Sequence, residues 1–251
     1  MVRICVSGGL GHMGRRISRI VKETPGAELS LIIDRQDTPE DPGDFANARI
    51  TTDNTEVSSV DVVIDFSAPG QAISVLKECA KSGTGVVIGT TGFTSGQKDE
   101  ITELASATPV LLSPNMSIGV NLIFKLARII TESLPGFDRE VVEAHHNRKA
   151  DAPSGTALRI AEIMAREGEE LLKGRTPDSG PRKPSQVGVH AVRGGGIVGE
   201  HTAMWIGEDE RIELFHRAET RDIFASGAVR AALWLHGRSP GKLYTMEDVL
   251  S

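Results

Sequence analysis

Five short runs of aliphatic and β-branched residues, separated by helix-like stretches, dominate the first 115 residues. The runs occupy residues 2–8, 29–34, 60–67, 85–92 and 109–115, and AISVLKECAKSG and QKDEITELAS lie between them. Nearly continuous apolar strands that alternate with helices are typical of a parallel sheet covered on both faces. We therefore predict an α/β domain whose ligands bind beyond the carboxyl ends of the strands.

The pattern changes after the helix-like stretch NLIFKLARIITESL. Three segments have strand character: DREVVEAHHN, QVGVHAVRGGGIVGEHTAMWIG and ERIELFHRAET. No long helix-like stretch separates the later strands from one another. They predict a second, mixed or antiparallel sheet. SGAVRAALWLHG near the end is helical again and is expected to return to the first domain, whereas residues 173–186 are rich in Pro, Gly and basic residues and predict an exposed loop.

Composition excludes several classes of protein. Hydrophobic residues make up 39% and charged residues 25% of the 251 residues, as in soluble globular enzymes. A formal net charge of −6 argues against a nucleic-acid partner. No apolar run approaches the roughly 18–20 residues that span a bilayer, and the chain opens on a strand-like segment rather than a signal peptide. Cys5 and Cys79 are expected to be reduced and buried, so the predicted location is cytoplasmic.

A glycine-rich turn joins the first predicted strand to the first predicted helix. SGGLGHMGRR places glycines at 8, 11 and 14, which permit a tight turn, close approach to a pyrophosphate and close packing of helix on strand. The helix start offers amide donors to phosphates. Asp34 ends the next strand about 20 residues later, as in dinucleotide-binding units. Although a glycine-rich turn alone is often only a turn, this context predicts a dinucleotide site.

The residues after the second strand bear on which nicotinamide cofactor binds. Asp34 can accept hydrogen bonds from ribose hydroxyls, which favours NADH, and Arg35 can neutralise a 2′-phosphate, which admits NADPH. The pair predicts tolerance of both cofactors, while Arg35 as a solvated surface charge is the alternative. IGTTGF (88–93) and SPNMSIGV (113–120) follow later strands and are expected beside the nicotinamide ring, unless they are ordinary connections.

The stretch EAHHNRKADAPSGTA, residues 143–157, gathers groups suited to binding and protonating an anion. His145 and His146 face one pocket only if the strand ends or twists there, because successive strand side chains point to opposite faces, and the polar residues that follow indicate that it ends. Ser154 opens a predicted helix whose first amides, with the Thr156 hydroxyl, form an anion site. Lys149 adds a positive charge and a proton. The alternatives are a structural His-His pair, a surface lysine and a simple helix cap.

A metal site is not predicted. The remaining histidines are dispersed, and no metal-ligand spacing of His, Glu or Cys occurs in the sequence.

The chain resembles the 4-hydroxy-tetrahydrodipicolinate (dihydrodipicolinate) reductase family of the lysine and diaminopimelate pathway. The matching stretches run along nearly the whole chain, and HHNRKADAPSGTA is highly specific; the others are SGGLGHMGR, VVIDFS, VIGTTGF, SPNMSIGVN, RGGGIVGEH and FASGAVRAALWL. The resemblance implies a Rossmann-like domain of residues 1–116 and 226–251, and a smaller α+β mixed-sheet domain of residues 117–225. The second domain would bind substrate and build a homotetramer.

The resemblance also implies an activity and its residues. NADH or NADPH would deliver hydride to C4 of the ring that a dicarboxylate substrate forms on losing water, giving tetrahydrodipicolinate. His145 and Lys149 match the proton donors, and the residues themselves do not decide between them. His146, Lys149, Gly155 and Thr156 match the contacts to a substrate carboxylate. The matches to cofactor contacts are Gly8, Gly9, Leu10, Gly11, His12, Met13, Asp34, Arg35, Gly89, Thr90, Thr91, Ser113, Pro114, Asn115 and Met116.

The chain departs from the family at one position of the glycine-rich turn, and two other functions compete with a reductase. Many family members carry arginine at the position of His12, so Arg35 matters more for NADPH in this chain. Another nicotinamide dehydrogenase acting on a small carboxylated substrate shares the first half but does not explain HHNRKADAPSGT. A non-catalytic nucleotide sensor would have lost the His and Lys residues, which are intact here.

Overall fold

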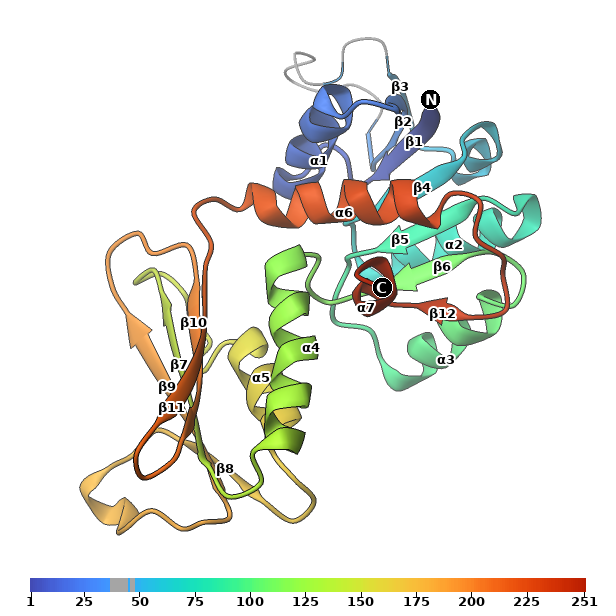
Figure 1. Ribbon diagram of the computed structural model, residues 1–251. Coiled ribbons are helices and arrows are strands. Elements are labelled where there is room, and N and C mark those ends of the chain that lie inside the picture. The colour runs from blue at the N-terminus through green and yellow to red at the C-terminus, as the bar shows by residue number, and fades with distance from the viewer. Residues whose placement is uncertain (37–44, 46–47) are drawn as a thin grey trace. The chain divides into compact units, whose positions relative to one another are not determined.

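The computed structural model describes residues 1–36, 45 and 48–251, which form two compact units. The first unit comprises Met1–Ile118 and Asp222–Ser251, and the second comprises Gly119–Arg221. The first contains a parallel sheet and the second a mixed sheet (Figure 1). The predicted fold class, a Rossmann-like domain with a second mixed-sheet domain, is confirmed.

Seven described strands form the sheet of the first unit, in the order β12-β6-β5-β4-β1-β2-β3. They are β1 (Val2–Ser7), β2 (Ala27–Ile33), β3 (Arg49–Thr51), β4 (Val62–Asp65), β5 (Gly85–Ile88), β6 (Val110–Leu112) and β12 (Leu243–Tyr244). All neighbouring pairs are parallel. The chain order reverses between β1 and β4, which is the switch point where dinucleotides bind in such sheets.

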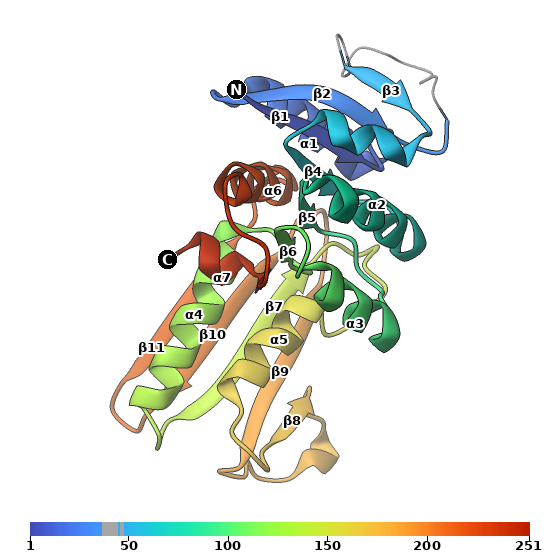
Figure 2. The same ribbon diagram turned by 90° about the vertical axis from the view of Figure 1, so that its right-hand side faces the viewer.

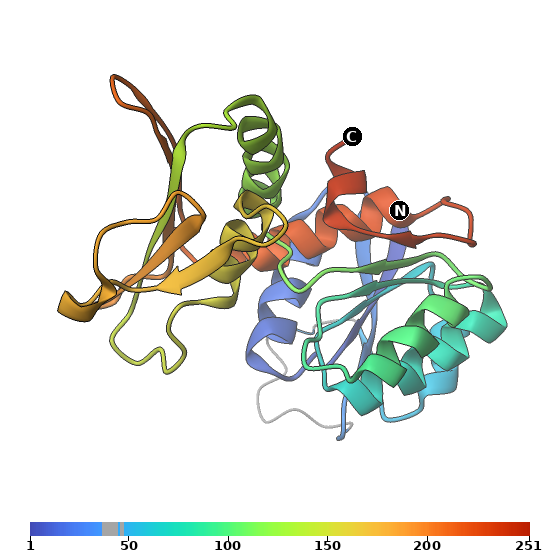
Figure 3. The same ribbon diagram turned by 90° about the horizontal axis from the view of Figure 1, so that it is seen from below.

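Helices cover both faces of this sheet, as the uninterrupted apolar strands require. They are α1 (His12–Glu23), η2 (Asn54–Ser59), α2 (Pro69–Ser82), α3 (Ser95–Leu104), α6 (Asp222–Leu235) and α7 (Met246–Val249). Residues of α1, α6 and α7 share a buried apolar cluster with one face, and residues of η2, α2 and α3 share a cluster with the other. Figure 3 shows α6 and α7 on the side opposite α2 and α3.

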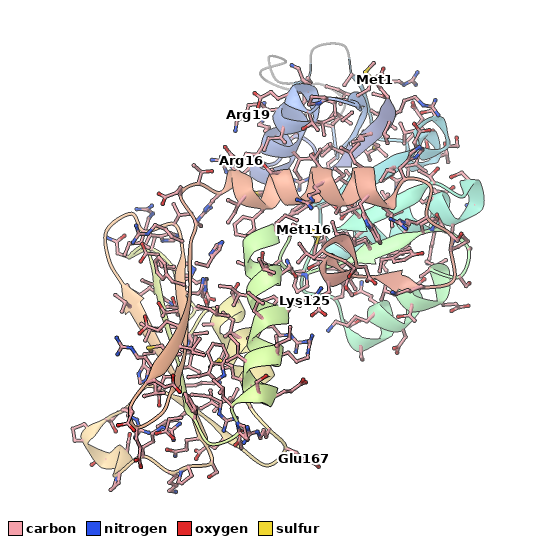
Figure 4. All side chains as sticks on the ribbon, viewed as in Figure 1. Met1, Arg16, Arg19, Met116, Lys125 and Glu167 are labelled. Atoms are coloured by element: carbon pink, nitrogen blue, oxygen red, sulfur yellow. The ribbon has the colours of Figure 1, made fainter. Side chains whose placement is uncertain are left out.

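The start of α6 is bound to α1 by two ion pairs. Asp222, the first residue of α6, accepts from Arg16 at 2.5 Å and from Arg19 at 2.7 Å. Figure 4 labels both arginines on α1. Together with the buried alanines of α6, these contacts attach the last segment of the chain to the first unit.

The second unit is a five-stranded mixed sheet with two helices on one face. Its strand order is β11-β10-β7-β9-β8, with β10 antiparallel to its neighbours and the other pairs parallel. Helices α4 and α5 lie on the same side of this sheet (Figure 2), around the fully buried Trp205. The elements are α4 (Ile118–Ser133), β7 (Asp138–His145), α5 (Gly155–Met164), β8 (Glu170–Lys173), η3 (Pro177–Ser179), β9 (Gln186–Arg193), β10 (Glu200–Ile206) and β11 (Arg211–Arg217).

Several boundaries differ from the sequence-based expectation. The predicted strand 85–92 ends at Ile88, and the predicted strand 60–67 occupies only Val62–Asp65. The residues beyond those ends leave the hydrogen-bonded ladder and form loops at the carboxyl edge. The strands β3, β8 and β12 were not predicted, because two to four residues carry no detectable periodicity.

The basic segment 173–186 is bound to the sheet through Arg182. Its guanidinium contacts Asp138 at 2.5 Å and Glu140 at 3.2 Å, and Glu140 also contacts His190 at 2.9 Å. Glu140 on β7 thus pairs with one arginine and with one histidine of β9.

Candidate active site

The turn between β1 and α1 requires its glycines. Gly8 has a φ of +75°, and a Cβ there would lie 2.6 Å from the carbonyl oxygen of Phe66. A Cβ on Gly14 would lie 2.2 Å from the carbonyl oxygen of Gly8. Gly11 is the N-cap of α1 and provides no side-chain cap. The turn therefore presents backbone groups and the start of a helix, which suits a pyrophosphate.

A cavity of about 900 Å³ opens beside this turn, in the first unit. Five of the predicted cofactor residues line it: Gly8, Leu10, Gly11, Asp34 and Arg35. The Asp34 carboxylate accepts the Leu10 amide at 2.8 Å and the Arg35 amide at 2.7 Å, so it is held at the rim. The other lining residues were not predicted as cofactor residues; they are Ile33, Gln36, Thr52, Phe66, Ser67, Ala68 and Gln71. Residues 66–68 directly follow the carboxyl end of β4, where ligands of parallel sheets bind, so their place in the strand pattern could have indicated them.

The remaining predicted cofactor residues of the β1–α1 turn have distinct positions. Gly9 packs closely against β2, since a Cβ on it would lie 2.6 Å from the Ile32 side chain. His12 and Met13 are the first residues of α1, with His12 exposed and Met13 half-buried.

The loops after β5 and β6 contain both buried and exposed residues. Gly89 adjoins the Phe66 ring, because a Cβ on it would lie 2.2 Å from that ring. Thr90, Ser113 and Met116 are buried, Asn115 is half-buried, and Thr91 and Pro114 are exposed. The Ser113 hydroxyl donates to the Asn115 carbonyl at 2.8 Å, which shapes the turn after β6.

A buried carboxylate joins the loops after β4 and β5. Asp65 accepts the Thr90 hydroxyl at 2.6 Å and the Ser67 hydroxyl at 2.8 Å. Burial raises the pKa of Asp65, and the hydrogen bonds oppose that rise. The Thr90 hydroxyl also accepts the Ser67 amide at 2.9 Å. The Thr90 hydroxyl therefore links the loop after β5 to the loop after β4, and both of its hydrogen bonds are to protein groups.

In the second unit, β7 ends at His145, as the sequence analysis required for a His-His site. Nδ1 of His145 lies 2.6 Å from Oε2 of Glu143, two residues earlier on the same face. Arg193 of β9 donates to both Glu143 oxygens at 2.8 Å. The Ser154 amide donates to Oε1 at 2.9 Å. Glu143 and Arg193 were not predicted as site residues, although the two-residue spacing of Glu143 and His145 was visible in the sequence.

Ser154 is the N-cap of α5, and its hydroxyl accepts the Ala157 amide at 3.2 Å. The same hydroxyl forms a 3.2 Å hydrogen bond with Nε2 of His201. The amides of Ser154 and Ala157 are thus engaged within the protein, and Gly155 and Thr156 lie between them in the first turn of α5. A Cβ on Gly155 would meet no atom within 4 Å, so this position is open.

Two cationic side chains, Lys149 and Arg221, lie near His146. Nζ of Lys149 pairs with Asp151 at 2.8 Å, and Nε2 of His146 lies 3.2 Å from Arg221. Burial, followed by nearby cations that include Arg221 and Lys149, lowers the pKa of His146. The structure therefore brings His145, His146 and Lys149 into one polar region around the end of β7.

The buried His201 is expected to make folding pH-dependent. Burial, assisted by the neighbouring His145, lowers its pKa to about 4. In the unfolded chain a histidine titrates near 6.5, so between about pH 6.5 and pH 4 only the unfolded state binds this proton. The stabilisation is complete above pH 6.5 and is lost as the pH falls through that window, by about 3 kcal/mol.

The measurement is urea unfolding of wild type and His201→Gln at several pH values between 7 and 4. The variant should lose less stability than wild type over this range, and His236→Gln, which removes an exposed histidine, should follow wild type. Identical pH dependence in wild type and His201→Gln would contradict the assignment.

No group of three or more His, Cys, Asp or Glu side chains suited to a metal ion occurs within residues 1–36, 45 and 48–251. None of the helices in that part of the chain is both long and apolar enough to cross a membrane.

Comparison with known proteins places both units in one family. The family model described as dihydrodipicolinate reductase, N-terminus, matches residues 2–116, and the model of its C-terminus matches residues 119–250. The chain belongs to the dihydrodipicolinate reductase family. The resemblance predicted from sequence is confirmed, and with it the prediction of an oxidoreductase that uses NADH or NADPH.

Individual relatives agree. The chain is 44% identical over 265 residues to 4-hydroxy-tetrahydrodipicolinate reductase of Syntrophotalea carbinolica, covering 100% of this chain and 99% of the relative. It is 42% identical to the enzyme of the same name from Anaeromyxobacter dehalogenans, covering 100% and 98%. Among solved structures, dipicolinate-bound dihydrodipicolinate reductase from Paenisporosarcina sp. TG-14 superposes with a TM-score of 0.81 at 25% identity, covering 98% of this chain and 97% of that one.

Proposed function

We propose that this chain reduces 4-hydroxy-tetrahydrodipicolinate, through dihydrodipicolinate, to tetrahydrodipicolinate in lysine and diaminopimelate biosynthesis. The observation that carries the proposal is the match of the two family models to residues 2–116 and 119–250, across both units. Full-length identity of 42–44% to curated reductases of that name supports the same substrate.

We assign nucleotide binding to residues 1–116 and 226–251. When bound, NADH or NADPH supplies the hydride. The β1–α1 turn with Gly8–Met13 holds the pyrophosphate, Asp34 and Arg35 bind the ribose end, and Gly89–Thr91 with Ser113–Met116 adjoin the nicotinamide end. The cavity beside Gly8, Asp34 and Arg35 supports this assignment.

We assign substrate binding to residues 117–225. His145 or Lys149 donates the proton that the product of hydride addition requires, and an imidazolium or ammonium can act as the acid near neutral pH. His146, Lys149, Gly155 and Thr156 hold a substrate carboxylate. The clustering of cationic groups with the start of α5 supports this assignment, since a dianionic ring needs such partners.

We propose that the protein is a cytoplasmic homotetramer assembled through its second sheet. Helices α4 and α5 lie on the face that buries Ala203 and Trp205, and strand alternation directs Thr202 and Met204 to the other face. Phe215, paired with Thr202, is 54% exposed and Val192 is 49% exposed. Apolar side chains on an uncovered sheet face are typical of a subunit interface. Light scattering of the purified protein measures the subunit number.

The function is tested by a coupled assay. Dihydrodipicolinate synthase generates the unstable substrate in the same reaction mixture. The loss of absorbance of the reduced nicotinamide is followed with NADH and NADPH separately. Turnover with either reductant supports the proposal, and the ratio of kcat/KM gives the preference. Absence of turnover from folded protein that binds nucleotide would refute it.

A further inference from the structure

We propose that Glu143 is the positioning residue of this site, selecting the tautomer of His145 and attaching the start of α5 to the same carboxylate. The inference rests on the proposed function for the role of His145. Its geometry lies wholly within the second unit.

Both oxygens of Glu143 are fully engaged. Its side chain is 0% exposed. Oε1 accepts from Nη2 of Arg193 at 2.8 Å and from the Ser154 amide at 2.9 Å. Oε2 accepts from Nη1 of Arg193 at 2.8 Å and lies 2.6 Å from Nδ1 of His145. A buried carboxylate with a bidentate arginine and two further partners has a single orientation.

These contacts keep Glu143 ionised. Burial would raise its pKa, but hydrogen bonds from Arg193, His145 and Ser154 outweigh burial, so the pKa is lowered. Arg193 holds this position because it pairs with His145 in the parallel register of β7 and β9. The Asp151 carbonyl oxygen accepts from Arg193 at 2.7 Å, which further fixes the guanidinium.

An ionised carboxylate only accepts hydrogen bonds, so Nδ1 of His145 must donate. The neutral imidazole therefore carries its proton on Nδ1, and Nε2 is the nitrogen that gains and releases the exchangeable proton. Gly199 lies beside Nε2, where a Cβ would come within 3.0 Å. Because residue 199 is glycine, no side chain from this position crowds Nε2, the nitrogen that exchanges the proton.

The same carboxylate holds the start of α5. Its bond to the Ser154 amide fixes the N-cap residue, from which Gly155 and Thr156 follow directly. The Ser154 hydroxyl is in turn bonded to His201. One side chain thus sets the relative position of a proton donor and a carboxylate-binding helix start, and rate depends steeply on such positioning.

The decisive variant is Glu143→Gln. If the glutamine oxygen accepts from the Ser154 amide, its NH2 group faces Nδ1 and can only donate, so the variant no longer selects the Nδ1–H tautomer. We expect kcat to fall about 100-fold, within the range for general acid catalysis, while KM for substrate changes less than about threefold. Glu140→Gln is the matched control, because Glu140 is also on β7 and also pairs with an arginine, Arg182, and a histidine, His190.

A spectroscopic measurement tests the inference without turnover. Nitrogen-15 NMR at alkaline pH reports which ring nitrogen of His145 is protonated, and His145→Gln identifies the signal. Wild type should show the Nδ1–H form and Glu143→Gln a mixture or the Nε2–H form. An Nε2–H tautomer in wild type overturns the inference even if the variant fails to fold.

The experiments distinguish a failure of the positioning role of Glu143 from a failure of the proposed function. If wild type turns over substrate but Glu143→Gln matches it in kcat and tautomer, the inference fails and the proposed function stands. If wild type shows the Nδ1–H form and does not turn over substrate, the proposed function fails and the positioning role is retained. A loss in Glu140→Gln as large as in Glu143→Gln would also overturn the inference.

Discussion

Lys149→Ala is expected to lower kcat/KM for the dicarboxylate substrate by about 10²–10⁴-fold, the range for loss of a general acid. Nζ of Lys149 is held 2.8 Å from Asp151, and the lysine side chain is 21% exposed. The hydrogen bond from Lys149 lowers the pKa of Asp151, so the carboxylate remains ionised and keeps the ammonium in place. In its proposed role Lys149 supplies a charge for the substrate carboxylate and a proton, and the alanine variant would lack both.

The coupled assay with separate kcat and KM values measures this effect. A loss confined to KM assigns Lys149 to carboxylate binding, whereas a loss in kcat assigns it to proton transfer. Lys173→Ala is the control, because Lys173 is exposed at the end of β8 in the same unit. Equal activity of Lys149→Ala and wild type would show that Lys149 is only a surface charge.

Arg139→Met is expected to destabilise the protein by about 3–5 kcal/mol, as when one partner of a buried ion pair is removed. The Arg139 side chain is 2% exposed and donates to Glu169 at 2.6 Å and to the Met164 carbonyl, the last residue of α5, at 2.6 Å. Burial raises the pKa of Glu169, but the bonds from Arg139 and the Arg166 amide lower it overall. Methionine would leave that carboxylate and the helix end without this donor.

Urea unfolding followed by tryptophan fluorescence measures the loss, since Trp205 is buried in the same unit. Arg159→Met is the control: Arg159 pairs with Glu162 on the surface, with both side chains more than half exposed, and such pairs contribute at most about 1 kcal/mol. An Arg139→Met protein as stable as the control would refute the role assigned to this ion pair.

Local sequence patterns predicted the turns, strand ends and helix starts that depend only on neighbouring residues. The glycines at 8 and 14 were predicted from one turn motif, and close contacts at both positions explain them. The end of β7 beside His145 and the helix start at Ser154 were likewise visible, because strand alternation and capping depend on neighbouring residues. The short strands β3, β8 and β12 were missed because their pairing, and not their own sequence, defines them.

The candidate site was only partly visible for the same reason. Its histidines and lysine lie in one contiguous motif, but Arg193 and His201 come from strands about 50 residues away. They reach Glu143 and Ser154 only because β9 pairs in parallel and β10 antiparallel with β7. Both lie in RGGGIVGEH, a stretch that matches the family, but the sequence does not show that Arg193 contacts Glu143 until that register is known.

The sequence by itself determined the family, the parallel-sheet domain and the glycine-rich turn, and it proposed the candidate site residues, since each depends on residues close together in the chain. Only the tertiary structure decided which partners those side chains have. The pairing of β7 with β9 and β10 set the buried Glu143 between His145, Arg193 and Ser154, because register and burial arise from contacts between distant segments. Those contacts in turn select the ionisation state of Glu143 and the orientation of the imidazole beside it.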